Sequence, residues 1–294
     1  MLIDTHAHLN FDVYKDDFDE VIRRSLDNGI WMTNVGTNFE TSKRAVKISQ
    51  KYPTGVYAAI GLHPINLDTG LVRIKIDPAE FSKKTHGASE TEDAHFEKEF
   101  DFEKYKKLAL RSFSEGKVVA IGEIGLDYYW KPKTTKKKQL FKQRQKDLLS
   151  EELELAKTLN LPVIFHCRMA HSDLIEFLSE NPKLMPKRAV AHGFVGNLEQ
   201  LQEYLNFGFY IGFNGIIFKK IEGIDFEENI KKTPLEKILI ETDCPYLTPP
   251  PFENERNEPL YLRYIVQKIA KIKKIISERI AEITTKNARE LFKT

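Results

Sequence analysis

Eight short apolar runs recur along the chain, and longer amphipathic segments separate most of them. The runs are rich in β-branched and aromatic residues and mostly end at Gly, Pro, His or Asp, as buried parallel strands do. They read "MLIDTHAHL", "IWMTNVGT", "VYAAIGLHP", "VVAIGEIGLDYY", "PVIFHC", "RAVAHGF", "FYIGFNGIIF" and "KILIETDCPYL". This repeated β-α alternation predicts an α/β protein with a (β/α)8 TIM barrel, and an open doubly wound sheet is the alternative. A dinucleotide-binding sheet is disfavoured because no G-x-G-x-x-G follows the first run.

The remaining segments predict helices and one insertion. Amphipathic patterns such as "DDFDEVIRRSLDNG" and "NLEQLQEYLNFG" predict helices between the strands, and the tail from Pro259 to Thr294 predicts two C-terminal helices that close the barrel. Residues 66–107 exceed an ordinary βα loop and carry seven acids between Glu90 and Glu103. We expect a solvated acidic insertion here, after the third strand, leading into a helix near Phe102–Phe113. The whole chain, 1–294, is expected to form one domain around this insertion.

Net charge, the lack of long apolar segments and the cysteine content limit the class of protein that we expect. Forty-five basic and 43 acidic residues give a formal charge of +2, so a nucleic-acid partner would have to meet a local basic patch. We find no signal peptide and no segment near the roughly 18 apolar residues of a membrane helix, so no membrane contact is expected. The two cysteines, Cys167 and Cys244, are far apart and are expected to be reduced thiols. We therefore expect a cytoplasmic protein, and no protein partner is predicted.

Histidines and carboxylates gather where the predicted strands end. The C-terminal face of a (β/α)8 barrel carries its active site, so residues at these ends are expected to converge. They are His6, His8, His63, Glu123, His166, His192 and Asp243. His6 and His8 are two residues apart and would face the same way in an extended chain. A buried carboxylate is costly without a cation, which favours a metal site over a hydrogen-bonded core.

The number of candidate ligands predicts two divalent metal ions. Imidazole and carboxylate suit Zn²⁺, Mn²⁺, Fe²⁺ or Co²⁺, and a carboxylate-bridged pair could also use Mg²⁺. The expected ligands are His6, His8 and Asp243 for one ion and His166 and His192 for the other, with Glu123 bridging them. Two such ions can generate hydroxide and stabilise the attacking and leaving oxygens of a hydrolysis reaction.

The motifs "DTHAHL", "GLHP", "GEIGLDYY", "HCR", "ETDCPYLTP" and "RNEP…TTKNARELF", in this order, resemble the TatD family of metal-dependent hydrolases and deoxyribonucleases. The similarity covers essentially the whole chain outside the acidic insertion. It implies an amidohydrolase-type barrel, the six metal ligands His6, His8, Glu123, His166, His192 and Asp243, and cleavage of phosphodiester bonds in DNA. Two positions depart from the usual motifs: Met169 replaces an acid beside Arg168, and Gly193 replaces a cysteine.

Three roles are predicted for residues around this centre. Asp243, Glu123 and His63 are the expected catalytic residues, with Asp243 taking the proton from the attacking water. Arg168 and His63 are expected to contact the substrate phosphate. Glu241 and Asp4 could orient imidazoles, or be ordinary buried acids.

The other candidates are less directly tied to the metals. Cys167 and Cys244 alternate with ligands and should point away from the site, and His171 is expected on an exposed helix face. From Lys131 to Lys146 there are eight Lys or Arg and no acid, directly after Tyr128, Tyr129 and Trp130. Lysines beside aromatics can bind single strands, and Tyr128 is the predicted substrate contact, although a solvated helix start is equally compatible.

Three functions follow in order of preference. The main hypothesis is a 3'-5' exonuclease that cleaves single-stranded DNA ends with a metal-bound hydroxide. The alternative is a metal-dependent ester or amide hydrolase of the amidohydrolase type, including one that deacylates charged tRNA. The third is a non-catalytic barrel that binds nucleic acid.

Overall fold

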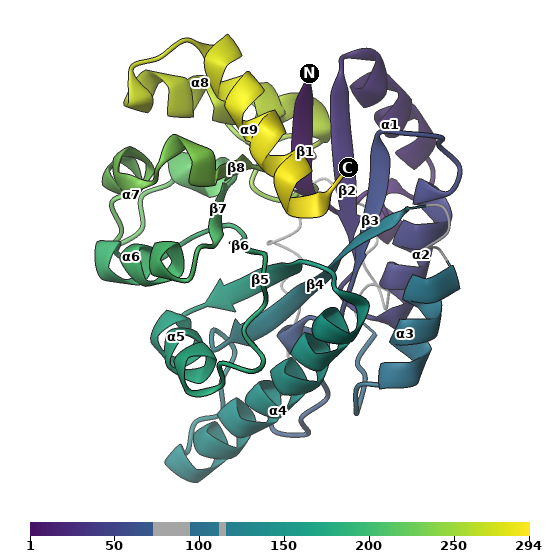
Figure 1. Ribbon diagram of the computed structural model, residues 1–294, viewed down its shortest axis with the longest axis vertical. Helices are drawn as coiled ribbons and strands as arrows, with labels where there is room; N and C mark the ends of the chain where they lie inside the picture. Colours follow the sequence, from purple (N-terminus) through teal and green to yellow (C-terminus); the bar gives the residue numbers. More distant parts are fainter. Residues whose placement is uncertain (73–94, 112–115) are drawn as a thin grey trace.

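The computed structural model describes residues 1–72, 95–111 and 116–294. Within them the eight expected strands form one parallel sheet that runs from β1 to β8 in chain order (Figure 1). The bounds are β1 (Leu2–Ala7), β2 (Ile30–Val35), β3 (Val56–Ile60), β4 (Val118–Asp127), β5 (Val163–Arg168), β6 (Ala189–Ala191), β7 (Tyr210–Phe213) and β8 (Ile238–Ile240). A parallel bridge between Ala7 and Cys244 brings the two edges of the sheet together. The predicted (β/α)8 barrel is confirmed.

Helices surround the sheet and connect its strands (Figure 1). They are α1 (Phe18–Asp27), α2 (Phe39–Ser49), α3 (Phe102–Arg111), α4 (Thr135–Leu159), α5 (His171–Glu180), α6 (Leu198–Asn206), α7 (Phe226–Lys232), α8 (Leu262–Lys273) and α9 (Ser277–Phe292). The two C-terminal helices are as predicted. The helix expected near Phe102–Phe113 is confirmed as α3, and residues 112–115 lie outside the described part of the chain.

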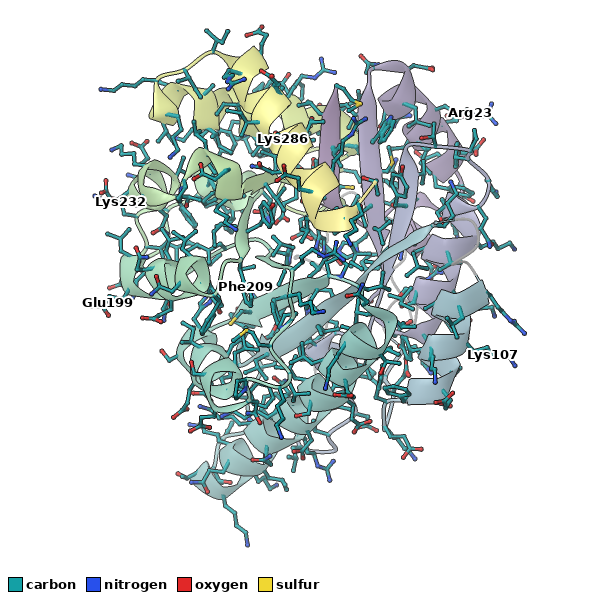
Figure 2. The ribbon with its side chains drawn as sticks, in the orientation of Figure 1. Arg23, Lys107, Glu199, Phe209, Lys232 and Lys286 are labelled. Carbon is teal, nitrogen blue, oxygen red and sulfur yellow. The ribbon has the colours of Figure 1, made fainter. Side chains whose placement is uncertain are left out.

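Local sequence explains several helix ends. Asn38 caps α2 by accepting a hydrogen bond from the backbone N–H of Thr41, whose hydroxyl accepts in return, and Asn197 begins α6 in the same way. Outward faces carry charges: Figure 2 shows Glu199 and Lys232 projecting from the outer helices, while Phe209 lies among the packed side chains of the interior. The helices therefore bury one face against the barrel.

The interior of the barrel is filled at the end where the strands begin. Three residues of α9, Ala288, Leu291 and Phe292, are buried there and form one apolar cluster with interior strand residues. The strand residues of this cluster are Ile3, Val35, Ala59, Val119, Ala120, Ile164, Val190 and Leu239. Since α9 closes this end, the opposite end, where the strands finish, is left for chemistry.

Only the two ends of the predicted 66–107 insertion are described before α3 begins. Leu67 and Glu97 form a parallel bridge, and the N–H of Asp68 donates to the carbonyl of Glu97 at 2.7 Å. Residues 73–94, with His86 and three of the seven acids, lie outside the described residues. No described helix is both long and apolar enough to cross a membrane.

Candidate metal centre

The structure brings the six predicted ligands together at the C-terminal ends of the strands. Glu123 and His166 lie within β4 and β5, while His192 and Asp243 follow the short strands β6 and β8. His6 lies near the end of β1 and His8 just after it, where the register with β2 shifts between Asp4 and Ala7. All six are largely buried, and the Asp243 side chain is the most exposed, at 18%.

One group of ligand atoms is formed by His6, His8 and Asp243, which lie within 4.8 Å of one another. The Nε2 atoms of His6 and His8 are 3.1 Å apart. Oδ1 of Asp243 lies 3.4 Å from Nε2 of His8 and 3.9 Å from Nε2 of His6. The i, i+2 spacing therefore places both imidazoles on one site, as the sequence predicted.

Glu123 lies between this group and a second one, and its two carboxylate oxygens face different histidines. Oε2 lies 3.4 Å from Nε2 of His6 and 3.9 Å from Nε2 of His8. Oε1 lies 2.6 Å from Nδ1 of His166 and 3.1 Å from Nε2 of His192. A carboxylate in this position is placed to join two cations.

The residues present fit a divalent metal. Four imidazoles and two carboxylates gather their nitrogen and oxygen atoms in two adjoining buried groups, a donor set typical of Zn²⁺, Mn²⁺ or Fe²⁺ sites. No cysteine takes part, because Cys167 and Cys244 are buried free thiols, both in apolar clusters. Their predicted orientation away from the centre is thus consistent with their packing.

Two histidines are oriented by groups behind them. Nδ1 of His8 lies 2.8 Å from the carbonyl oxygen of Val35, and Nδ1 of His192 lies 3.0 Å from Oε1 of Glu241. Each contact favours a proton on Nδ1 and leaves Nε2 as the metal-binding atom. Glu241 therefore orients an imidazole, which is one of the two roles that the sequence left open for it. Asp4 does not: its carboxylate accepts hydrogen bonds from the backbone N–H groups of His6 and Thr242.

Asp127 is a site residue that the sequence reasoning missed. Its Oδ2 lies 3.1 Å from Nε2 of His166, on the side of the ring away from Glu123. The side chain of Gln145 holds the Asp127 backbone by accepting from its N–H and donating to its carbonyl. Strand alternation was the available signal, because Glu123 and Asp127 are four residues apart on β4 and so share a face.

Burial and neighbouring charges set the ionisation of the centre. Burial disfavours the imidazolium of His166, but Glu123 and Asp127 outweigh it and raise the pKa of His166 to about 9. Burial, reinforced by His166, lowers the pKa of His63 to about 3. Burial also opposes ionisation of Glu123, yet the surrounding histidines hold the pKa of its carboxyl well below its usual range. Glu123 is thus a carboxylate, the form that binds a cation.

His63 contacts two of the candidate metal ligands, Glu123 and His166. Its Nε2 is 3.5 Å from Oε1 of Glu123, and its ring packs edge-on against His166. Nδ1 of His63 accepts a hydrogen bond from the N–H of Ile65 at 2.9 Å, so the neutral ring carries its proton on Nε2. This places an N–H donor at the centre.

Arg168 lies beside the centre on an aromatic surface. Its guanidinium stacks on the ring of Tyr129, 3.6 Å from the centroid, and this contact orients the arginine although Met169 supplies no acid. Tyr128 was predicted as the substrate contact, but its side chain is only 4% exposed and packs beneath Lys142. Tyr129, at 43% exposed, is the accessible residue of the pair.

The prediction that His171 is exposed is wrong. His171 begins α5 and is 6% exposed, with its Nδ1 3.0 Å from the hydroxyl of Tyr204. Its ring packs against Phe194, among core residues. Helix phase could not be assigned from "MAHSD" alone, and a polar residue at a helix start is usually solvated.

Comparison with known proteins shows which family this chain belongs to. The chain matches the family described as TatD related DNase over residues 3–293. The uncharacterized metal-dependent hydrolase YabD of Bacillus subtilis is 37% identical over 295 residues, covering 100% of this chain and 99% of that protein. The 3'-5' ssDNA/RNA exonuclease TatD of Citrobacter rodentium is 32% identical over 298 residues, covering 99% and 97%. The crystal structure of YjjV, a TatD homologue from Escherichia coli K12, has a TM-score of 0.77 and 28% identity, covering 100% and 98%. The chain therefore belongs to the TatD family and is a metal-dependent hydrolase.

Proposed function

We propose that this protein is an exonuclease that removes nucleotides from the 3' ends of single-stranded DNA with two divalent ions. The observation that carries the proposal is the position of Glu123, whose two oxygens face two separate sets of histidines. Paired ions bridged by a carboxylate are the usual arrangement for phosphodiester hydrolysis. The relative named as a 3'-5' ssDNA/RNA exonuclease aligns over nearly the whole chain and supports the choice of substrate.

The six buried ligands would hold the two ions. His6, His8 and Asp243 would bind one, His166 and His192 the other, and Glu123 both. Ions bound here activate water and stabilise negative charge on the phosphate oxygens. Asp243 is the ligand best placed to take the proton of the attacking water, because its side chain is the most exposed of the set.

Two further side chains would act on the phosphate. The Nε2–H of His63 points at the centre and would donate to a phosphate or leaving oxygen. The guanidinium of Arg168, held flat on Tyr129, would bind a phosphate oxygen at the rim. Lys131, Lys133 and Lys136 are exposed after β4 and would contact phosphates farther along the strand.

The test is cleavage of an end-labelled single-stranded oligonucleotide with Mg²⁺, Mn²⁺ or EDTA. We expect a metal-dependent ladder that shortens from the 3' end, with loss of at least about 100-fold in rate for Glu123→Gln. Glu152→Gln is the matched control, because Glu152 is a buried glutamate of α4 outside the ligand set, and it should retain the ladder.

Two outcomes would contradict the proposal. Metal-loaded protein that leaves oligonucleotides intact would refute it and favour the ester or aminoacyl substrates of the alternative hypothesis. A ladder that survives in Glu123→Gln would show that the cleavage arises elsewhere.

A further inference from the structure

A pocket of about 460 Å³ opens beside the metal centre, between the chain after β3 and the chain after β4. Its size falls within the roughly 300–1,000 Å³ of small-ligand sites. Its walls are mainly apolar and aromatic: Pro64, Ile65, Leu67, Phe96, Trp130 and Phe141. All six lie among the described residues of the segments that follow β3 and β4.

The pocket shares a wall with the metal centre. Asp127 lines it, and Oδ2 of the same carboxylate lies 3.1 Å from Nε2 of His166. Pro64 lines it as well and directly follows His63. A ligand inside the pocket would therefore lie next to a phosphate held at the centre.

Two polar residues in the wall beside the metal centre, Asp127 and Gln145, already bond to the protein. Asp127 contacts His166 and accepts a hydrogen bond from the N–H of Tyr129, and Gln145 makes two hydrogen bonds to the Asp127 backbone. Apart from the exposed carboxylate of Asp68, the surface that remains for a ligand is mainly apolar and aromatic. Such a wall suits a flat ring that binds by stacking, without reading its hydrogen-bonding edge.

The rings of Tyr129 and Trp130 connect the pocket to Arg168, the residue proposed to bind a phosphate. The guanidinium of Arg168 stacks on Tyr129, and the Tyr129 ring meets the Trp130 ring edge-on, with centroids 5.1 Å apart. A phosphate on Arg168 and a ring on Trp130 would thus lie on neighbouring positions. Adjacent phosphate and base are the repeating parts of a nucleic-acid strand.

We propose that this pocket holds one nucleobase of the substrate strand, at or next to the 3' end, with its ring against Trp130. The inference rests on the proposed nuclease function and specifies which part of the substrate binds in the pocket. Because stacking is available to every base, the pocket would bind the strand end with little sequence preference.

Kinetics with base-less substrates test the proposal. Oligonucleotides carry an abasic residue at the last or the second-last position, beside a natural strand. Of the two abasic strands, we expect metal-loaded wild type to cleave the one whose missing base would occupy the pocket about tenfold more slowly than the natural strand. Trp130→Ala should slow cleavage of the natural strand to that level and leave the abasic strand unaffected, and Trp130→Phe should restore part of the difference.

Equal rates on all strands for the wild type would overturn the proposal while leaving the nuclease function intact. So would a Trp130→Ala variant that is slowed equally on natural and abasic strands. Failure to cleave any strand would instead count against the nuclease function, and a binding measurement then decides the pocket separately.

Fluorescence supplies that measurement, because the chain has two tryptophans at opposite ends of the barrel. Trp31 lies near the beginning of β2, packed against Tyr57 and Arg289, whereas Trp130 follows the end of β4. In metal-loaded Trp31→Phe protein, Trp130 is the single tryptophan. Deoxyadenosine monophosphate should quench its emission, and deoxyribose 5-phosphate should not.

Quenching that deoxyribose 5-phosphate matches, or no quenching at all, would refute base binding on Trp130. Trp130→Phe protein, which keeps only Trp31, is the control and should give no change with either compound.

Discussion

Asp127 contacts His166 on the side of the imidazole opposite Glu123, with 3.1 Å between Oδ2 and Nε2. The contact orients the ring of His166, because it holds Nε2 toward Asp127 and leaves Nδ1 facing Glu123. Asp127 is therefore a positioning residue for a ligand, although it does not itself reach the other ligands.

Asp127→Asn should weaken metal binding without unfolding the barrel. Loss of the charge behind His166 is expected to lower metal affinity about 10–100-fold. Metal titration followed by cleavage assays measures this, with saturating metal recovering part of the rate. Asp68→Asn, which changes an exposed carboxylate on the same pocket, is the control and should leave the affinity unchanged.

His63→Ala should separate substrate contact from metal binding. Its Nε2–H faces the centre, so removing it should lower kcat by about 10–1,000-fold. If His63 acts only on the phosphate, the purified variant retains the wild-type metal content by elemental analysis, whereas His166→Ala loses metal. A His63→Ala protein that also loses metal would make His63 a ligand.

If the basic segment after β4 binds the strand, the affinity for single-stranded DNA should depend on salt through its lysines. Replacing Lys133, Lys136 and Lys137 by alanine removes three exposed charges. If each contacts a phosphate, the slope of log affinity against log salt should become shallower by about 2. The comparison is a triple alanine variant of Lys271, Lys274 and Lys286, which lie on the C-terminal helices or directly after α8, and its slope should match the wild type. Equal slopes for both variants would exclude the segment from strand binding.

His171 predicts a loss of stability in acid. Burial lowers the pKa of His171 to about 4, so the folded protein keeps the ring neutral while the unfolded chain binds a proton below its ordinary value of 6.5. Stability is therefore unaffected above about pH 6.5 and falls toward pH 4, by up to about 3 kcal/mol. Denaturant unfolding of His171→Gln should show a shallower fall than the wild type over this range, and identical pH profiles would contradict the assignment.

The buried carboxyl of Glu152 should make the folded state less stable as the pH rises, which is the opposite of the effect of His171. Burial raises the pKa of its carboxyl well above the usual value, so the folded state favours the protonated form while the unfolded chain ionises. The wild type is therefore penalised as pH rises, and Glu152→Gln should gain stability relative to it between about pH 5 and pH 8. Thermal unfolding at both pH values measures the gain, and Glu154→Gln on the exposed face of α4 should show none.

Strand-end reasoning predicted that the candidate ligands would converge, because a parallel barrel forces every strand to finish at one face. His6 and Asp243 are far apart in the chain but contact each other for that reason. The same reasoning could not distinguish Tyr128 from Tyr129 after the strand ended, because alternation no longer fixes which side chain is buried. For Asp4 the sequence left two roles open, and the structure shows the buried acid: its carboxylate accepts from backbone N–H groups and does not orient an imidazole.

The packing of α9 into the barrel makes completion of the fold depend on a segment that is synthesised after all six candidate ligands. The hydroxyl of Thr285 donates to the carbonyl of Met1 across 284 residues, and Leu291 and Phe292 complete the floor beneath β1. A growing chain carries His6 and His8 out of the ribosome at the start, but the floor beneath them is made last. Contacts this distant in sequence form late and slowly. A chain that ends between Asp243 and α9 therefore holds all six candidate ligands and still lacks the floor of the barrel.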